Sequence, residues 1–299
     1  MSDLPVAEGG EGTDPPFRRI AVIGFGLIGA SLALAVRRLW PSVLLVAVDR
    51  RGVIERAMRM HAADAGGDDL ALAAGAELVV LAAPVLANIE IIGKIAAHIP
   101  GDAVVTDVGS TKRDIVFAAR GLPDRLRFVG GHPLAGAAVG GVEASRADLF
   151  QGRPWILTPD GDAAAAAGSR LSVLLTAIGS HVQTMPPDAH DALVAYLSHL
   201  PQLAASALMH VVGEHAGHDG LALAGRGLRD TTRLASSPAD IWRDIAASNQ
   251  DNIARAIDEL VAILLRMKPV PDAPPEALDR TFDSAAQWKR VLDRAAGPS

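Results

Sequence analysis

Short apolar runs that end in glycine, proline or an acidic residue alternate with helical patterns through the first half of this 299-residue chain. The runs are too short for buried helices, and their Val, Ile and Leu content is typical of strands covered on both faces of a parallel sheet. Five such runs are expected at residues 19–24, 43–48, 77–83, 103–108 and 127–130. This alternation predicts an α/β fold with a Rossmann-like, doubly wound parallel sheet.

The strand patterns stop near the middle of the chain. Two further strands are expected at residues 155–158 and 182–185, and beyond them helical patterns cover residues 189–212, 238–267 and 275–296. We therefore predict a disordered leader, a dinucleotide-binding Rossmann domain and an all-helical substrate and dimerisation domain, over residues 1–17, 18–186 and 187–299. Because the helical part is long and apolar, we expect a homodimer.

Composition excludes several function classes. The chain has no cysteine, which rules out disulfides, thiolate zinc sites, iron–sulfur clusters and cysteine nucleophiles. Its net charge of −6 argues against a nucleic-acid partner, which needs a basic face. The acidic N-terminus has no apolar core of a signal peptide, and the most apolar stretch, residues 78–87, is half the length that a bilayer span requires. We expect a cytoplasmic protein with a small-molecule substrate, no nucleic acid and no membrane.

A glycine-rich loop follows the first predicted strand and opens the next helix, with the sequence Gly24-Phe25-Gly26-Leu27-Ile28-Gly29. In a dinucleotide-binding loop of this spacing, the first glycine permits a tight turn and the second lets the backbone approach the pyrophosphate. The third allows the helix to pack closely on the strand, and the helix N-terminus supplies N–H donors for the phosphates. We therefore predict that the cofactor is bound by Gly24, Gly26, Leu27, Ile28 and Gly29.

An acidic residue at the end of the second predicted strand completes this fingerprint. Asp49 lies twenty residues after Gly29, where it can accept hydrogen bonds from the adenosine ribose hydroxyls. A carboxylate repels a 2′-phosphate and so favours NAD, but Arg50 and Arg51 follow directly and could pair with that phosphate, which keeps NADP as the alternative. Pro84, after the third predicted strand, either marks the loop that bends over the cofactor or simply ends the strand.

Two more segments follow the fourth and fifth predicted strands, at the sheet edge where doubly wound folds bind ligands. The first contains Ser110, which can hydrogen-bond a reacting hydroxyl and can equally cap the helix predicted from Thr111. The second contains His132, which lies between glycines and a proline in a predicted loop. Since histidine is the usual general base near neutral pH, we predict that His132 is a catalytic base.

Five segments together resemble the prephenate/arogenate dehydrogenase family of tyrosine biosynthesis. They are the glycine-rich loop, Asp107–Lys112, Gly130–Gly136, Ser198–Pro201 and Gly227–Arg233. The last three are far more specific than the nucleotide loop, and the resemblance covers about residues 18–268.

The resemblance implies an NAD-dependent oxidative decarboxylation of prephenate, arogenate or both. A hydride leaves C4 of the cyclohexadienol substrate, the hydroxyl proton is withdrawn, and carbon dioxide leaves C1 as the ring becomes aromatic. On this basis His132 withdraws the proton, and Ser110 orients the hydroxyl group.

The resemblance also implies substrate-binding roles. Arg233 is carried over as the forked donor that holds a carboxylate of the dianionic substrate, and Arg229 is a second candidate. Ser198 and His199 are expected to border the substrate, with a satisfied core histidine as the alternative for His199. Arg226 interrupts the glycine run that the family usually has at this point, which leaves the side-chain specificity open.

Two other classes compete with this interpretation. A β-hydroxyacid dehydrogenase would share the fold, but such enzymes use a lysine early in the helical half, and residues 113–267 contain no lysine. A non-catalytic NAD-binding sensor would need the nucleotide loop but neither the histidine, the serine nor the arginines. His215 and His218 have the spacing of a metal-binding pair, but no third ligand completes the set, so no metal is predicted.

Overall fold

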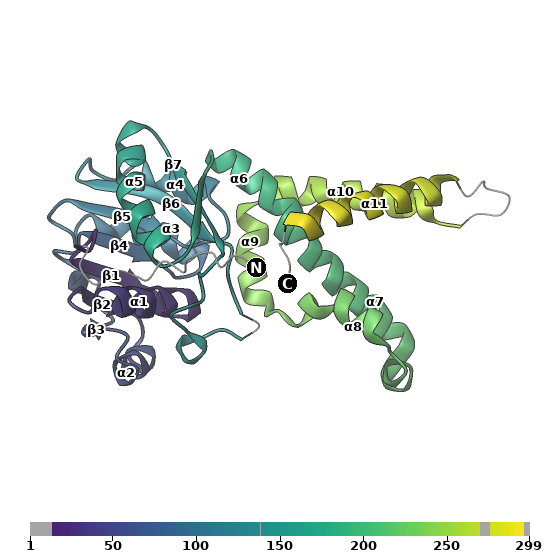
Figure 1. The fold of residues 1–299 in the computed structure, drawn as a ribbon, viewed down its shortest axis with the longest axis horizontal. Coiled ribbons are helices and arrows are strands. Elements are labelled where there is room, and N and C mark those ends of the chain that lie inside the picture. The colour runs from purple at the N-terminus through teal and green to yellow at the C-terminus, as the bar shows by residue number, and fades with distance from the viewer. Residues whose placement is uncertain (1–13, 138, 270–275, 296–299) are drawn as a thin grey trace, which may run out of the picture. The chain divides into compact units, whose positions relative to one another are not determined.

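The computed structural model describes residues 14–137, 139–269 and 276–295, and the chain divides into two compact units, residues 1–250 and 251–299. The first unit contains an eight-stranded sheet in the order β3-β2-β1-β4-β5-β6-β7-β8 (Figure 1). Neighbouring strands are parallel except β6 and β7, which are antiparallel. The strands are β1 (Arg19–Ile23), β2 (Leu44–Val48), β3 (Ala65–Gly67), β4 (Leu78–Leu81), β5 (Ala103–Asp107), β6 (Leu126–Pro133), β7 (Pro154–Pro159) and β8 (His181–Thr184).

Helices cover both faces of this sheet, which confirms the predicted doubly wound α/β fold. One face buries apolar side chains of α1 (Leu27–Leu39), α2 (Arg51–Arg59) and α5 (Asp162–Ala177) against the strands. The opposite face does the same with α3 (Val85–Ile95) and α4 (Arg113–Ala119). Short 3-10 turns, η1 (Leu70–Ala73) and η2 (Val142–Ala144), lie in the connections. The carboxyl ends of the parallel strands therefore meet at one edge of a rigid, two-sided core.

Two strands differ from the prediction. The sequence analysis missed β3, whose sequence Ala-Gly-Gly has no apolar run because the strand lies at the sheet edge and pairs only with β2. It also ended the fifth predicted strand too early, because β6 continues to Pro133. The predicted loop position of His132 is therefore wrong: His132 is a strand residue opposite Ile156 of β7, and the antiparallel partner is what extends the strand.

Beyond β8 the described residues are mainly helical, as predicted. The elements are α6 (Pro187–Val194), a π-helical turn η3 (Ala195–His199), α7 (Leu200–Ala222), α8 (Arg226–Thr231), a 3-10 turn η4 (Arg233–Ser236), α9 (Ala239–Ser248), α10 (Gln250–Met267) and α11 (Glu276–Ala295). The prediction of one helix over residues 238–267 is wrong. Asn249, with φ −136° and ψ 35°, leaves the helical region of backbone conformation and separates α9 from α10.

The consecutive elements α6, η3 and α7 form a helical stretch of 36 residues, Pro187–Ala222, which is kinked at Gly217, with φ 60° and ψ −172°. Its mean hydropathy reaches 1.3 over its most apolar window, of which 28% is buried. By length and composition alone this stretch could cross a membrane, whereas the expectation of no membrane rested on residues 78–87.

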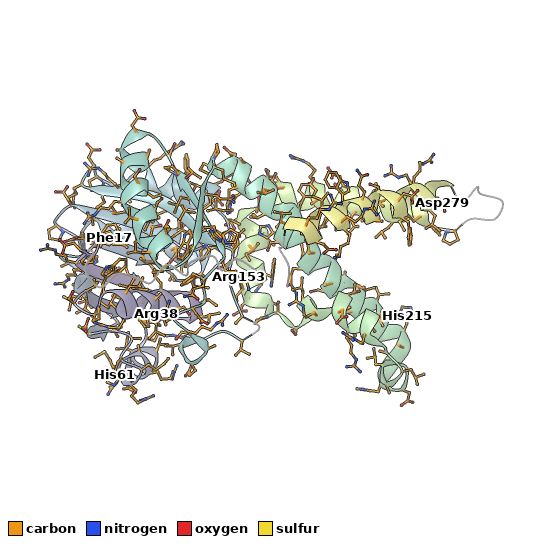
Figure 2. All side chains as sticks on the ribbon, in the orientation of Figure 1. Phe17, Arg38, His61, Arg153, His215 and Asp279 are labelled. Carbon is orange, nitrogen blue, oxygen red and sulfur yellow. The ribbon has the colours of Figure 1, made fainter. Side chains whose placement is uncertain are left out.

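The predicted leader ends earlier than expected. Phe17, which Figure 2 labels, is fully buried in the core, and the Arg170 guanidinium lies 4.2 Å from the centre of its ring. Arg170 also donates a hydrogen bond of 2.7 Å to the Pro16 carbonyl. Including these residues in a disordered leader is therefore wrong, and residues 1–13 lie outside the described part of the chain.

Candidate active site

The glycine-rich loop has the backbone geometry that its spacing predicts. Gly24 has φ +91°, and a Cβ atom there would lie 2.4 Å from the Ala83 nitrogen, so only glycine fits. A Cβ at Gly29 would lie 2.3 Å from the Gly24 carbonyl oxygen, which shows how closely α1 packs on the turn. At Gly26, by contrast, no described atom lies within 4 Å of an added Cβ. The surface over Gly26 is therefore open to a ligand that approaches the backbone.

The first turn of α1 offers its N–H groups to such a ligand. The helix begins at Leu27, Gly26 supplies no capping side chain, and the first turn has no acidic residue. N–H groups at a helix N-terminus lack intrahelical partners and attract phosphate oxygens. The loop and helix together therefore fit the pyrophosphate of a dinucleotide.

Asp49 joins this loop to the end of β2. Its Oδ2 accepts a hydrogen bond of 2.6 Å from the Phe25 N–H, and its Oδ1 accepts one of 2.6 Å from the Arg50 N–H. The side chain remains 18% exposed, so the carboxylate is fixed in place yet reachable. This is the position from which an acid can accept hydrogen bonds from ribose hydroxyls.

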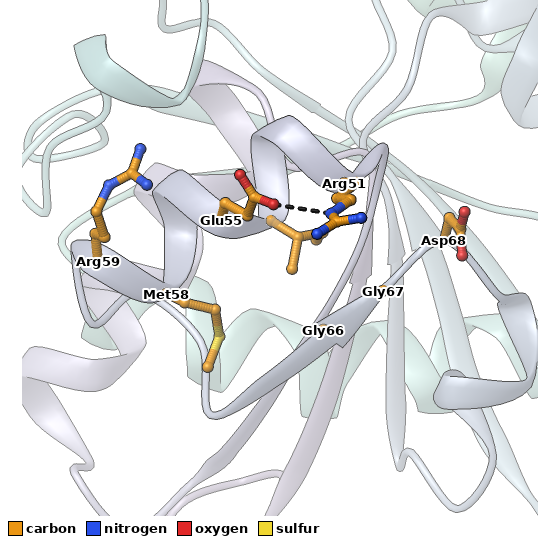
Figure 3. A pocket seen from close by; sticks show the side chains of 8 residues that line it. Arg51, Glu55, Met58, Arg59, Gly66, Gly67 and Asp68 are labelled. Carbon is orange, nitrogen blue, oxygen red and sulfur yellow. Dashed lines mark hydrogen bonds and ion pairs between the residues drawn. The ribbon is translucent and has the colours of Figure 1, made fainter.

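An open pocket of about 460 Å³ lies between α2 and β3 (Figure 3). Gly67 in its wall accepts the Asp49 N–H at 2.9 Å. Arg51 also lines it, and its Nε lies 2.9 Å from Glu55 Oε1 on the next turn of α2. Arg51 is therefore partnered within its own helix.

The turn after β4 lies against the glycine-rich loop. Pro84 caps the N-terminus of α3 and is exposed. The turn is held by the fully buried Asn88, whose Nδ2 donates to the Leu81 and Ala83 carbonyls at 3.2 and 2.9 Å and whose Oδ1 accepts the Ala83 N–H at 3.2 Å. The role of Asn88 was not predicted from the sequence, because a single amide among the apolar residues of a helix belongs to no motif that would indicate its hydrogen bonds.

A single carboxylate ties together the two segments that carry Ser110 and His132. Asp107, at the end of β5, accepts the Gly109 N–H at 2.8 Å and the Gly131 N–H at 3.0 Å. It also forms an ion pair with Lys112, and both side chains are completely buried. Burial lowers the pKa of Lys112 from its usual 10.5, and the Asp107 carboxylate opposes that shift.

Ser110 lies between these two charged residues on the β5–α4 connection. It is half-buried, and α4 begins only at Arg113, with Lys112 at the N-cap. The alternative that Ser110 caps the helix is therefore wrong, and its hydroxyl is left for another partner.

His132 begins a chain of buried hydrogen bonds that crosses to α6. Its Nδ1 lies 2.9 Å from Nε2 of His190, and His190 Nδ1 lies 2.7 Å from Oδ1 of Asp191. Asp191 also accepts the backbone N–H groups of Lys112 and Arg113 at 2.7 and 3.0 Å. The His190 and Asp191 side chains are fully buried, and His132 is 8% exposed.

The sequence analysis missed this His190–Asp191 pair. The available signal was two adjacent polar residues inside an apolar helical pattern, eight positions before the Ser198-His199 segment. Without the fold, nothing in the sequence relates them to a strand 58 residues away.

The environment keeps His132 neutral. Burial lowers its pKa well below the usual 6.5, and electrostatic interactions with the nearby His190, Lys112 and His199 add to this shift. A neutral imidazole at neutral pH has a lone pair with which to accept a proton.

His199 lies in the same cluster, on the π-helical turn. Pro201 has no N–H to bond to the preceding turn, and the helix widens directly before it. Burial lowers the pKa of His199 to about 4. Its Nδ1 lies 3.3 Å from the Asn249 amide nitrogen and therefore accepts a hydrogen bond, which puts the proton on Nε2. That Nε2 is buried and has no hydrogen-bond partner among the described residues, so His199 is not the fully satisfied core histidine of the alternative. Ser198, its neighbour, is exposed.

The two candidate arginines lie in different elements. Arg229 is in α8, whereas Arg233 begins η4 after a break at Thr232, and both are exposed. Within the described residues, neither guanidinium has an ion-pair partner, and neither contacts His132. Arg226 is also exposed, at the first position of α8.

Gln202 anchors the turn that carries Arg233. This amide, three residues after His199, donates to the Leu234 carbonyl at 2.7 Å and accepts the Ser237 hydroxyl at 3.1 Å. The arginine turn is therefore held on α7 close to the helical turn that carries His199, although the sequence analysis did not identify Gln202.

Comparison with known proteins gives a consistent result. Residues 32–184 match the profile of the prephenate dehydrogenase nucleotide-binding domain, and residues 186–273 match that of the prephenate dehydrogenase dimerization domain. Prephenate dehydrogenase of Bacillus subtilis (strain 168) is 33% identical over 282 residues, which cover 91% of this chain and 76% of that protein.

Two solved structures are also similar. Synechocystis arogenate dehydrogenase is 30% identical with a TM-score of 0.71, and the match covers 93% of this chain and 98% of that one. Prephenate dehydrogenase from Aquifex aeolicus, in complex with hydroxyphenyl propionate and NAD+, is 29% identical with a TM-score of 0.80, and covers 93% and 97%.

Proposed function

The chain belongs to the prephenate dehydrogenase family, and from this premise we propose how its residues carry out the family's reaction. The protein is an oxidoreductase for the NAD-dependent oxidative decarboxylation of prephenate or arogenate, a step of tyrosine biosynthesis. The observation that supports the assignment of residues is a buried cluster at the sheet edge that contains His132 and His199, beside the β5–α4 connection that carries Ser110 and is bonded through Asp107 to the Gly131 N–H.

His132 acts as the base on the substrate hydroxyl. When bound, NAD would supply the acceptor for the hydride that leaves C4. As that hydride leaves, the hydroxyl O–H bond breaks, its proton passes to the neutral His132 ring, and the oxygen becomes a carbonyl. Loss of carbon dioxide from C1 then sends an electron pair back through the ring to this oxygen, which His132 reprotonates as the ring becomes aromatic. Ser110 does not cap α4. Its hydroxyl group hydrogen-bonds the substrate hydroxyl and orients it toward His132.

Cations and neutral donors hold the dianionic substrate. Arg233 binds a substrate carboxylate through its forked guanidinium, with Arg229 as a second cation nearby. His199 donates its unpartnered Nε2–H to the substrate, and Ser198 borders the same region. Because burying an N–H without an acceptor is unfavourable, a ligand that satisfies His199 gains binding free energy.

The cofactor end fits NAD. Gly24, Gly26, Leu27, Ile28 and Gly29 would hold the pyrophosphate, Asp49 would accept hydrogen bonds from the ribose hydroxyls, and Pro84 would border the nucleotide. Two observations favour NAD over NADP: the Asp49 carboxylate is fixed beside the loop, and Arg51 is paired with Glu55.

We assign nucleotide binding to residues 18–186 and substrate binding and dimerisation to residues 187–299. A homodimer explains why the long helix of residues 187–222 exposes apolar side chains such as Leu197 and Val211, which are 66% and 54% exposed. A second copy of the chain would cover these apolar side chains, so the helix needs no membrane around it. We therefore place the enzyme in the cytoplasm.

The direct test of the function is NADH formation, followed at 340 nm, with prephenate and arogenate assayed side by side and with NAD and NADP. We expect turnover with at least one of the two substrates and a higher kcat/KM for NAD. Tight NAD binding without turnover of either substrate would overturn the assignment.

Replacing Arg233 with Ala is expected to raise KM for the dicarboxylate substrate by about 10–100-fold, since a charge-assisted hydrogen bond contributes about 1.5–3 kcal/mol. The change in kcat should be smaller. Arg120→Ala is the matched control, because Arg120 is an exposed arginine paired with Asp160 at the C-terminal end of α4, away from the strand carboxyl ends. An unchanged KM in Arg233→Ala would remove Arg233 from this role.

A further inference from the structure

A buried row of three side chains runs from β6 to α6: His132, His190 and Asp191. His132 Nδ1 lies 2.9 Å from His190 Nε2, and His190 Nδ1 lies 2.7 Å from Asp191 Oδ1, so both pairs are hydrogen-bonded. The planes of the two histidine rings are inclined at 65°, and the ring centres are 5.1 Å apart. The reaction outlined above uses only the first member of this row.

The hydrogen-bond roles in this row follow from its carboxylate end. Asp191 accepts N–H groups from Lys112 and Arg113 and is therefore held as an acceptor. It can accept from His190 only if His190 carries its proton on Nδ1. Nε2 of a neutral His190 is then an acceptor, so the bond to His132 requires a proton on Nδ1 of His132. The remaining nitrogen of His132, Nε2, is left with its lone pair.

We propose that His190 and Asp191 form a positioning pair that fixes the tautomer and ring orientation of His132, so that Nε2 is the atom that receives the substrate proton. This inference rests on the proposed role of His132 as the base. Once His132 is protonated, its Nδ1–H still donates to His190, so the same bond supports the charged ring. The logic is that of a histidine base oriented by a second group, here with a histidine between base and carboxylate.

Other groups around His132 cannot take this role. Lys112 is held by Asp107, and neither residue bonds the His132 ring. His199 is bonded to Asn249. Among the described residues, His190 is the acceptor that reaches His132 Nδ1.

Two substitutions at His190 separate positioning from packing. In His190→Gln, the amide oxygen can take the place of Nε2 and accept from His132, whereas in His190→Leu no acceptor remains. We expect His190→Leu to lower kcat by about 100-fold, the range of a mispositioned general base, with KM little changed. His190→Gln should retain kcat within about 10-fold of the parent enzyme, since one neutral acceptor is preserved.

The tautomer of the His132 ring can be measured directly in the protein, without following the reaction. In the 15N spectrum of the histidine rings of the full-length protein, the His132 signals, assigned by their loss in His132→Asn, should show the proton on Nδ1. In His190→Leu they should show exchange between tautomers or a proton on Nε2.

The results that would overturn the positioning pair differ from the result that would overturn the role of His132 as the base. A parent protein that carries the His132 proton on Nε2 overturns the positioning pair, even if no His190 variant folds. So does a His190→Leu enzyme with parental kcat while His132→Asn is impaired. If His132→Asn itself retains full turnover, the assignment of the base fails instead.

Discussion

Replacing His132 with Asn is expected to lower kcat by about 100-fold or more, the usual contribution of a positioned general base. The physical reason is that the protein has prepared this ring to accept a proton. Burial and the neighbouring His190, Lys112 and His199 hold its pKa well below 6.5, so the ring is neutral and unprotonated on one nitrogen at neutral pH. Asparagine has a similar shape but no basic nitrogen. Single-turnover and steady-state NADH formation both measure the effect.

The control for this substitution is His61→Asn. His61, labelled in Figure 2, is exposed and has φ 53°, a left-handed conformation that Asn tolerates, so the substitution should leave kcat unchanged. NAD affinity, measured by fluorescence, should be parental in both variants. A His132→Asn enzyme with kcat within a few fold of the parent would show that another group removes the hydroxyl proton.

Replacing Asp107 with Asn is expected to lower the free energy of unfolding by about 3–5 kcal/mol, as happens when one partner of a buried ion pair is removed. The Lys112 ammonium would lose its counter-charge in a site that is completely buried. The new amide would also set an N–H donor against the Gly109 or Gly131 N–H, both of which donate to the native carboxylate. At about 2–4 °C per kcal/mol for a unit of this size, Tm should fall by about 6–20 °C.

The matched control is the double variant Asp107→Asn with Lys112→Met. It removes the buried charge together with its partner, and such replacements are often neutral or stabilising. We expect the double variant to recover most of the lost Tm, as measured by calorimetry, because the largest cost lies in the unpaired ammonium. If Asp107→Asn alone leaves Tm unchanged, the ion pair does not hold the two site segments together.

Local signals in the sequence were enough for the fold class and for the cofactor loop. The spacing of Gly24, Gly26 and Gly29 directly after an apolar run is a contiguous pattern, and the structure explains two of these glycines: Gly24 has φ +91° and lies against Ala83, and Gly29 lies against the Gly24 carbonyl. Because the glycines and the apolar run are neighbours in the chain, the pattern can be recognised before the fold is known, although the Ala83 contact that restricts Gly24 exists only in the fold.

Edges and ends of elements were harder to predict. β3 has no apolar run because it lies at the sheet edge, and β6 extends through His132 because an antiparallel strand from later in the chain pairs with it. The single predicted helix over residues 238–267 breaks at Asn249, a residue with bonds to His199 and to the Asp191 carbonyl. In each case a distant segment decides the local backbone.

By itself, the sequence determined that this chain forms a doubly wound sheet followed by helices. It also predicted a dinucleotide loop at Gly24–Gly29 and candidate catalytic residues at Ser110 and His132. Only the tertiary structure decided what surrounds them: Lys112 paired with Asp107, Asn88 holding the turn before α3, Gln202 holding the arginine turn, and His190 with Asp191 behind His132. The physical reason is distance along the chain. Buried polar groups must find partners wherever the fold brings them, and His132 finds its partner 58 residues away, where no periodicity or motif connects the two.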